Sequence, residues 1–260
     1  MLRVGVKSDK GKVRQRNEDS YCACEHLFAV ADGLGGHLAG EVASKLAIDQ
    51  LVDALSGKQC DAKQLEELFQ QANEKIYQLA SVNPQYQGMG ATLTAAQIWR
   101  DQILLGHVGD SRAYLYRAGE LTQLTHDHSL TAELYRKGEL SEEEAECHPQ
   151  RHILTKALGV SSQLDVDTSM VRFADRDILL LCTDGLHGKI SKEEMAEFLQ
   201  KLTDPQETAE KLVHAALEAG GQDNITVLIV LNAADEFVDH EFSLELDEIL
   251  EQYQQPLGVC

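Results

Sequence analysis

The stretch Leu27-Phe-Ala-Val-Ala-Asp-Gly-Leu-Gly-Gly-His-Leu-Ala-Gly-Glu41 joins an apolar run to an aspartate and a glycine-rich turn. The five apolar residues 27–31, ended by an Asp-Gly pair, predict a short buried strand. Beyond the turn, Val42, Leu46 and Leu51 fall on one face at helical spacing, which predicts an amphipathic helix. The chain therefore passes from strand to helix through an aspartate, with glycines that let the backbone approach closely.

Strands and helices occur in groups along the rest of the chain. Apolar or alternating runs predict strands at Leu2–Lys7, Tyr21–Cys24, Thr92–Trp99, Ile103–Val108, Arg112–Arg117, Leu121–Leu124, Leu164–Val171, Ile178–Cys182 and Ile225–Leu231. Further helices are predicted around Leu65–Leu79, Lys192–Leu202 and Pro205–Ala219. Helices in pairs between runs of strands favour an α+β fold over a βαβ repeat, with the helices covering sheets from outside.

Two segments differ from this pattern. Residues Thr125–Gly159 contain four histidines and few strand formers, and we expect a largely helical excursion over the sheet edge. No repeat or linker divides the chain, which predicts one domain over residues 1–234 and an acidic extension over 235–260. The extension has eight acidic residues, no Lys or Arg, and apolar residues at helical spacing. It is either a short helix that docks on the domain or a tail for partner binding or self-association.

Composition excludes several classes of protein. The chain has 260 residues, 43 acidic and 23 basic side chains and a formal net charge of −20. Nucleic acids and anionic membranes need clustered Lys and Arg, so neither is an expected partner. No apolar stretch has the length of a membrane span or a signal peptide. The six cysteines form no C-x-x-C pair or zinc spacing, which predicts a reduced, cytoplasmic protein.

Five aspartates stand at the ends of apolar runs: Asp19, Asp32, Asp110, Asp184 and Asp223. A single Asp-Gly pair is usually a turn. Several carboxylates delivered to one rim of an antiparallel sheet would repel one another unless a cation lay among them. Hard divalent cations take such oxygen ligands, so the pattern predicts a Mg²⁺ or Mn²⁺ site, to which Gly33 could add its carbonyl. Two such ions can share a water and lower its pKa from about 15.7 towards about 7.

An arginine and a histidine complete the predicted site. Arg14 lies five residues before Asp19, and its planar guanidinium suits phosphate oxygens. The same arginine could instead be a structural ion-pair partner of the aspartates. His37, on the glycine-rich turn, could protonate a leaving alkoxide, or it could cap the following helix.

A series of motifs follows in order along residues 3–231. The series is Arg14-x-x-Asn17-Glu18-Asp19, Asp32-Gly33-x-Gly35-Gly36-His37-x-x-Gly40-Glu41, Gly90-Ala91-Thr92, Gly109-Asp110-Ser111-Arg112, Asp127-His128-Ser129, Thr155-x-Ala157-Leu158-Gly159, Thr183-Asp184-Gly185-Leu186 and Asp223-Asn224-Ile225-Thr226. It resembles the motif series of the metal-dependent protein phosphatases of type 2C, in their compact bacterial form.

The resemblance implies a four-layer αββα sandwich with a binuclear Mn²⁺ or Mg²⁺ centre between the sheet edges. By similarity, Asp32 bridges the ions, Asp19 and the Gly33 carbonyl serve one, and Asp184 and Asp223 serve the other. Asp110 and Asp184 would form a weaker third site, and Thr125–Gly159 would be the flap that shapes substrate access. Leu34 stands where many eukaryotic relatives have histidine, and His152 and His187 replace an expected Asn and a non-histidine residue. None of these departures removes a predicted ligand.

The resemblance implies hydrolysis of phosphoserine and phosphothreonine in proteins by a metal-activated water, without a phosphoenzyme. The expected partners are phosphorylated proteins and a bacterial eukaryotic-like Ser/Thr kinase, and the expected state is a monomer. A catalytically silent module that binds phosphoproteins is an alternative, against which the complete ligand set argues. A hydrolase of small phosphate esters is another, although the chain has no nucleotide-binding P-loop.

Overall fold

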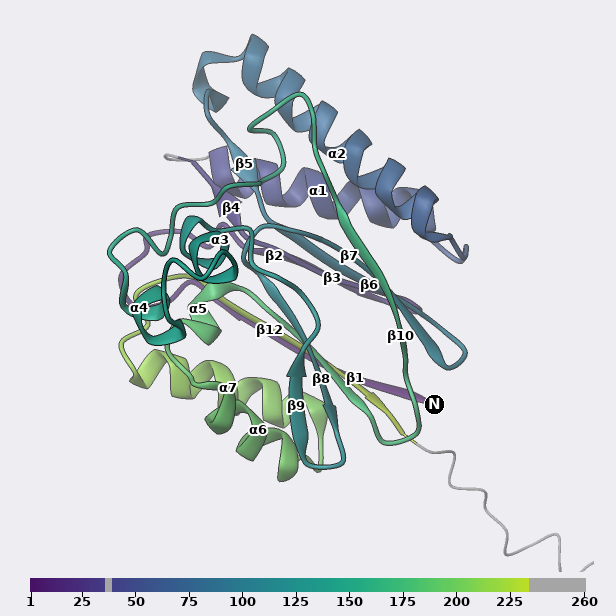
Figure 1. Ribbon diagram of the computed structural model, residues 1–260. Helices are drawn as coiled ribbons and strands as arrows, with labels where there is room; N and C mark the ends of the chain where they lie inside the picture. The colour runs from purple at the N-terminus through teal and green to yellow at the C-terminus, as the bar shows by residue number, and fades with distance from the viewer. Residues whose placement is uncertain (36–38, 234–260) are drawn as a thin grey trace, which may run out of the picture.

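The computed structural model of the protein describes residues 1–35 and 39–233, excluding the side chains of residues 142 and 146. Two five-stranded antiparallel sheets pack face to face between helices (Figure 1). The first sheet has the order β1 (Leu2–Asp9), β12 (Ile225–Asn232), β11 (Ile178–Cys182), β8 (Arg112–Arg117) and β9 (Glu120–Gln123). The second has the order β10 (Asp167–Arg172), β7 (Gln102–Val108), β6 (Leu93–Trp99), β3 (Leu27–Ala31) and β2 (Ser20–Cys24).

Helix pairs form the outer layers. Helices α1 (Ala39–Leu55) and α2 (Ala62–Val82) pack on the second sheet, and α6 (Lys192–Gln200) and α7 (Pro205–Glu218) pack on the first (Figure 1). Asp61 caps the start of α2: its carboxylate accepts the backbone N–H of Gln64, while the Gln64 side chain accepts the N–H of Asp61. The predicted four-layer α+β sandwich is confirmed.

The central strands are buried on both faces, which explains their continuous apolar sequences. In β3, Phe28 and Val30 belong to the core between the sheets, whereas Leu27, Ala29 and Ala31 pack towards α1 and α2. This alternation follows from the two-residue period of a strand. Strands β11 and β12 alternate in the same way, with one set of side chains in the core between the sheets and the other packed towards α6 and α7.

Several short elements were not predicted from the sequence. Two-residue strands β4 (Gly33–Leu34) and β5 (Gly90–Ala91) pair with each other beside α1. A 3₁₀ turn η1 (Pro84–Tyr86) follows α2, and the four-residue helix α5 (Asp184–His187) follows β11. Elements of two to four residues are too short to show a periodicity.

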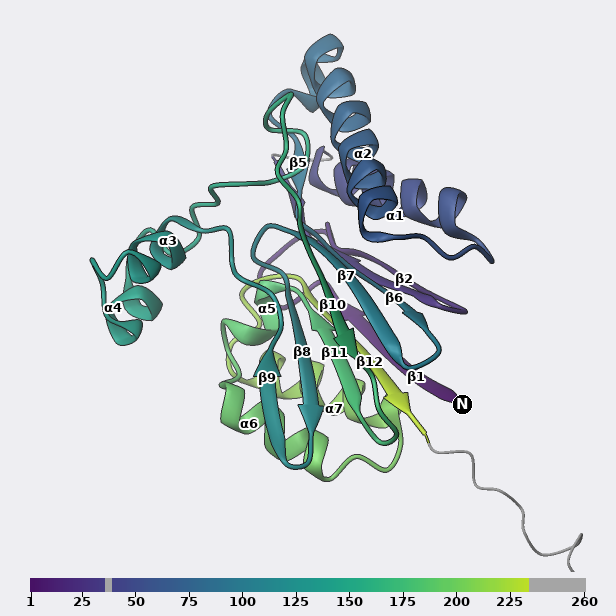
Figure 2. The same ribbon diagram turned by 45° about the vertical axis from the view of Figure 1, so that its right-hand side comes forward.

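The prediction of a largely helical excursion over residues 125–159 was wrong. Helices there are limited to α3 (Leu130–Arg136) and α4 (Glu142–Cys147), and the rest of this flap is irregular. Figure 2 shows both helices projecting away from the sandwich instead of lying on a sheet edge. Ser129 and Ser141 cap these two helices. Because the helices are short, they have little apolar surface to bury against the sheets.

Two further predictions meet the limits of the described range. No helix in residues 1–35 and 39–233 is both long and apolar enough to cross a membrane. The predicted extension over 235–260 lies outside the described residues, as does His37.

Candidate metal centre

The antiparallel topology delivers five aspartates to one end of the sandwich. Asp32 directly follows β3, Asp184 follows β11, and Asp223 comes just before β12. Asp110 lies in the turn that crosses from β7 of the second sheet to β8 of the first. Burial and then the charges of the other four carboxylates, that of Asp19 first, raise the pKa of Asp32 well above its usual range. The structure therefore brings together the five aspartates that the sequence singled out.

Asp19 is held by two hydroxyl groups that sequence analysis did not identify as site residues. Its Oδ2 accepts the hydroxyls of Thr183 at 2.9 Å and Thr226 at 2.7 Å. Its Oδ1 is buried and has no hydrogen-bond partner among residues 1–35 and 39–233. Burial raises the pKa of Asp19 to about 7, although the two threonine hydrogen bonds oppose the rise. Asp19 is thus fixed in orientation, with one oxygen left for a ligand.

Asp184 and Asp110 lie on the other side of the cluster. Asp184 also has a buried Oδ1, to which no described residue makes a hydrogen bond, and burial followed by the charge of Asp223 raises its pKa. Burial and then Asp184 raise the pKa of Asp110 to about 8. The Nε2–H of His187 donates to the Asp110 carbonyl at 3.0 Å. This bond gives His187, an unexpected residue for the position, a role in holding the Asp110 turn.

Glycines allow backbone segments to meet at the cluster. A Cβ atom on Gly33 would lie 2.2 Å from the carbonyl oxygen of Gly40, at the start of α1. A Cβ atom on Gly185 would lie 1.9 Å from the carbonyl oxygen of Asn224. No side chain fits at either place, so the strand ends and the helix starts that carry the aspartates are in direct backbone contact.

The loop that carries Arg14 is anchored by Asn224. The side-chain amide of Asn224 donates to the carbonyls of Lys10 and Arg16, at 2.9 and 2.8 Å, and its Oδ1 accepts the N–H of Glu18 at 2.8 Å. Arg14 makes a 2.8 Å ion pair with Asp223, in which both side chains are partly exposed. This is the ion-pair alternative that the sequence left open, and it places the guanidinium at the edge of the cluster.

The flap contributes a histidine to the same region. The Nδ1 of His152 lies 4.0 Å from Oδ2 of Asp184, and its ring is largely exposed. The other predicted histidine, His37, lies outside the described residues, so its predicted place in the site stays a prediction.

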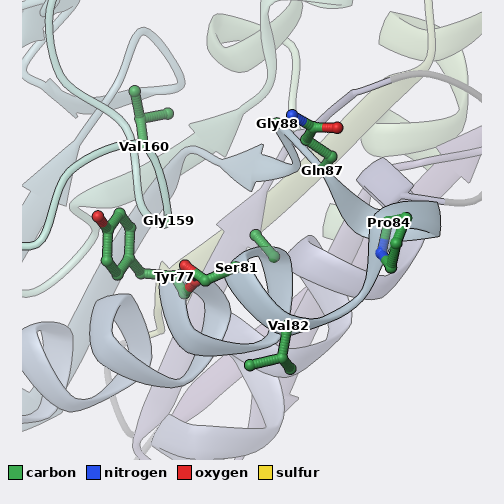
Figure 3. Close-up of a pocket in the computed structure, with 9 residues that line it drawn as sticks. Tyr77, Ser81, Val82, Pro84, Gln87, Gly88, Gly159 and Val160 are labelled. Atoms are coloured by element: carbon green, nitrogen blue, oxygen red, sulfur yellow. Dashed lines mark hydrogen bonds between the residues drawn. The ribbon is translucent and has the colours of Figure 1, made fainter.

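One pocket lies away from the aspartates, at the end of α2. A pocket of about 460 Å³ is formed between the end of α2, near Tyr77 and Val82, and the chain at Gly159 and Val160 (Figure 3). It is lined by no carboxylate, histidine or cysteine, and so it lacks the groups that the predicted chemistry needs.

The aspartate cluster fits a divalent cation. Two buried carboxylate oxygens without partners, on Asp19 and Asp184, are costly unless a cation or a donor satisfies them. Within the described residues, no three or more His, Cys, Asp or Glu side chains are arranged so that they alone could hold an ion. Ions at this site would therefore also use water and backbone oxygens, as Mg²⁺ usually does.

Five aspartates gather at one end of an αββα sandwich, and two of them keep a buried oxygen that no described residue bonds. Such a site is typical of proteins that bind divalent cations. Residues 12–219 match the protein phosphatase 2C family. The serine/threonine phosphatase stp of Listeria monocytogenes is 41% identical over 241 residues, which cover 88% of this chain and 95% of that protein. The chain belongs to the protein phosphatase 2C family.

Solved structures agree in fold. The catalytic domain of serine/threonine protein phosphatase PstP, in complex with two manganese ions, is 37% identical with a TM-score of 0.83, covering 90% of this chain and 99% of that one. Serine/threonine phosphatase Stp1 from Staphylococcus aureus is 32% identical with a TM-score of 0.85, covering 90% of this chain and 96% of that one. The family that the sequence motifs resembled is thereby confirmed.

Proposed function

We propose that this protein is a metal-dependent phosphatase that hydrolyses phosphoserine and phosphothreonine in proteins. The observation that carries the proposal is the pair of buried, partnerless oxygens on Asp19 and Asp184 within a cluster of five carboxylates. Family membership and the manganese ions of PstP support it. The catalytic domain would extend over residues 1–234.

The proposed ligands divide between two ions. Asp32 would bridge them, Asp19 and the Gly33 carbonyl would serve one, and Asp184 and Asp223 would serve the other. Asp110, with Asp184, would hold a weaker third ion. Two ions held by these residues would lower the pKa of a water and so supply a nucleophile at neutral pH. Either Mg²⁺ or Mn²⁺ suits this oxygen-rich set.

The other residues of the site bind and orient the substrate. Arg14, which is paired with Asp223 and partly exposed at the edge of the cluster, has a planar guanidinium that would bind phosphate oxygens through two parallel hydrogen bonds. Thr183 and Thr226 keep Asp19 oriented. His37 remains the predicted proton donor to the leaving alkoxide. A partner Ser/Thr kinase, a cytoplasmic location and a monomeric state also remain predictions.

The test is phosphate release from a phosphothreonine peptide with Mn²⁺ and with a chelator. We expect turnover only with Mn²⁺, and a fall to the chelator background in Asp223→Asn. Asp175→Asn is the matched control, because Asp175 is an exposed aspartate before β11, at the opposite end of the sandwich. Folded, Mn²⁺-loaded protein without turnover would instead favour a phosphoprotein-binding module.

A further inference from the structure

The turn Gly109–Asp110 has an unusual backbone that other parts of the chain must hold in place. Gly109 has a φ of +108°, and a Cβ atom there would lie 2.5 Å from Cγ2 of Thr92. Side chains rarely adopt this conformation, so the turn is available to glycine alone. The turn connects the two sheets and sets the position of Asp110, so whatever fixes Gly109 also fixes that carboxylate.

His128 is bonded to Gly109 in both directions. The backbone N–H of His128 donates to the Gly109 carbonyl at 2.8 Å, and the Gly109 N–H donates to Nδ1 of His128 at 3.1 Å. Because Nδ1 accepts, the ring proton is on Nε2, which lies 3.2 Å from Oδ2 of Asp167. The ring is 2% exposed and stacks on His107 at a centroid distance of 4.9 Å. One tautomer and one orientation are therefore imposed on His128.

The same residue joins the turn to the base of the flap. The carbonyl of His128 accepts the N–H of Thr155 at 2.8 Å, and the N–H of Leu130 donates to the Ile153 carbonyl at 2.9 Å. The two ends of the flap are thus bonded to each other where His128 meets Gly109. On the opposite side of the turn, His187 donates to the Asp110 carbonyl.

We propose that His128 is a positioning residue, which together with His187 clamps the Gly109–Asp110 turn and so holds Asp110 in the orientation in which it binds a cation. On one side of Asp110, the backbone N–H of His128 bonds the Gly109 carbonyl and its Nδ1 accepts the Gly109 N–H. On the other side, His187 bonds the Asp110 carbonyl. The proposal rests on the proposed function for the role of Asp110, but the clamp itself is a property of the metal-free protein.

Two substitutions separate the hydrogen bond from the bulk of the ring. His128→Asn keeps an acceptor close to the place of Nδ1, whereas His128→Gln keeps a donor near the place of Nε2 and loses the acceptor for Gly109. The first readout is hydrogen exchange of the Gly109 amide by NMR, in chelator and under native conditions. We expect exchange to be at least about tenfold faster in His128→Gln and close to that of the unaltered protein in His128→Asn.

The second readout is calorimetric Mn²⁺ binding. The affinity of the weakest ion should fall by about 10–100-fold in His128→Gln, with the tighter ions unchanged and with recovery in His128→Asn. If either variant does not fold, Asp167→Ala tests the same clamp from a half-exposed position and should change both readouts in the same direction by a smaller amount.

The outcomes are distinct. Equal behaviour of the Asn and Gln variants, or a Gly109 amide that exchanges as before in all three, would overturn the clamp and leave His128 as a packing residue. Protection of the Gly109 amide that depends on Nδ1 would support the clamp even if the protein hydrolysed no phosphopeptide. In that case the proposed function alone would fail.

Discussion

Two partly buried carboxylates near the site have opposite surroundings. Asp127 accepts hydrogen bonds from Nε and Nη2 of Arg112, at 2.9 and 2.7 Å. Burial acts to raise the pKa of Asp127, but Arg112 outweighs burial and the pKa is lowered. Among the described residues, no arginine or lysine bonds Asp184, whose nearest basic side chain is His152 at 4.0 Å, and both burial and Asp223 raise its pKa. The fold supplies Asp127 with hydrogen bonds from Arg112, whereas Oδ1 of Asp184 receives none from the described residues.

This contrast predicts opposite effects of the same substitution. At pH 8 in chelator, Asp184→Asn should raise the free energy of unfolding by about 0.5–2 kcal/mol, because it removes repulsion stored at a functional site. Asp127→Asn should lower it by roughly 3 kcal/mol, because Arg112 loses its partner. Urea denaturation of both variants measures the two changes. A loss of stability in Asp184→Asn as large as that in Asp127→Asn would contradict the assignment of Asp184 to a cation.

The sequence identified residues by type and position but not by their contacts. The five aspartates were predicted because each ends or precedes an apolar run. Thr183 and Thr226 were within the quoted motifs, yet their roles depend on β11 and β12 being neighbours, which brings both hydroxyls to Asp19. A strand order of this kind is set by the packing of the whole sheet. In the sequence, the role of these two threonines is indicated only by their nearness to Asp184 and Asp223.

Elements with a long apolar pattern were predicted well, and those without one were not. Strand β11 has the predicted bounds, because burial on both faces leaves a run of apolar residues between polar ends. The flap was assigned too much helix, since its charged residues have helix propensity but little apolar surface to pack. Strands β4 and β5 pair through backbone groups of glycine-rich segments, which leave no side-chain pattern to detect.

Packing between a helix and a strand gives a prediction at the scale of elements. A Cβ atom on Gly106 of β7 would lie 2.8 Å from Cε2 of Phe69, which is fully buried in α2. Gly106→Ala should therefore reduce the free energy of unfolding by about 1–3 kcal/mol through overpacking. Urea denaturation measures this loss.

A double-mutant cycle provides the control. Phe69→Leu alone should destabilise by leaving a void, but it makes room for the added methyl group, so the double variant should lose less than the sum of the two single losses. Additive losses would show that α2 does not pack on Gly106 as closely as the structure indicates.

At the scale of the whole molecule, the active end and the chain ends are separated. Strand β12 begins beside Asp223 and ends at Asn232, and the amino group of Met1 donates to the Ala233 carbonyl. Strands run from one end of the sandwich to the other, so residues 1 and 233 lie at the end opposite the aspartate cluster. Figure 1 marks the amino terminus at that end of β1. Repulsion among the aspartates is therefore confined to one end of the molecule, where it lowers the stability of the metal-free protein.

This repulsion makes the stability of the metal-free protein depend on pH. The pKa of Asp19 is raised to about 7 and that of Asp110 to about 8, so between pH 4 and 8 the native state binds more protons than the unfolded chain and loses stability as pH rises. Three histidines act in the opposite sense. Burial lowers the pKa of His107 to about 4 and that of His187 to about 3, and it also lowers the pKa of His128. Their contribution to stability therefore increases with pH, but only up to about 6.5.

Above pH 6.5 the carboxylates alone remain, so the metal-free protein should lose stability between pH 6.5 and 8. The loss should be at most about 1.4 kcal/mol per pH unit for each proton released. Mn²⁺ should replace these protons, so it should raise the melting temperature more at pH 8 than at pH 6.5. Calorimetric melting in chelator and in Mn²⁺ at the two pH values measures both effects. An Asp19→Asn/Asp110→Asn variant is the control, and its metal-free form should lose less stability between pH 6.5 and 8 than the unaltered protein does. Metal-free protein that became more stable between pH 6.5 and 8 would show that its carboxylates are already paired, and that a cation is not what the cluster lacks.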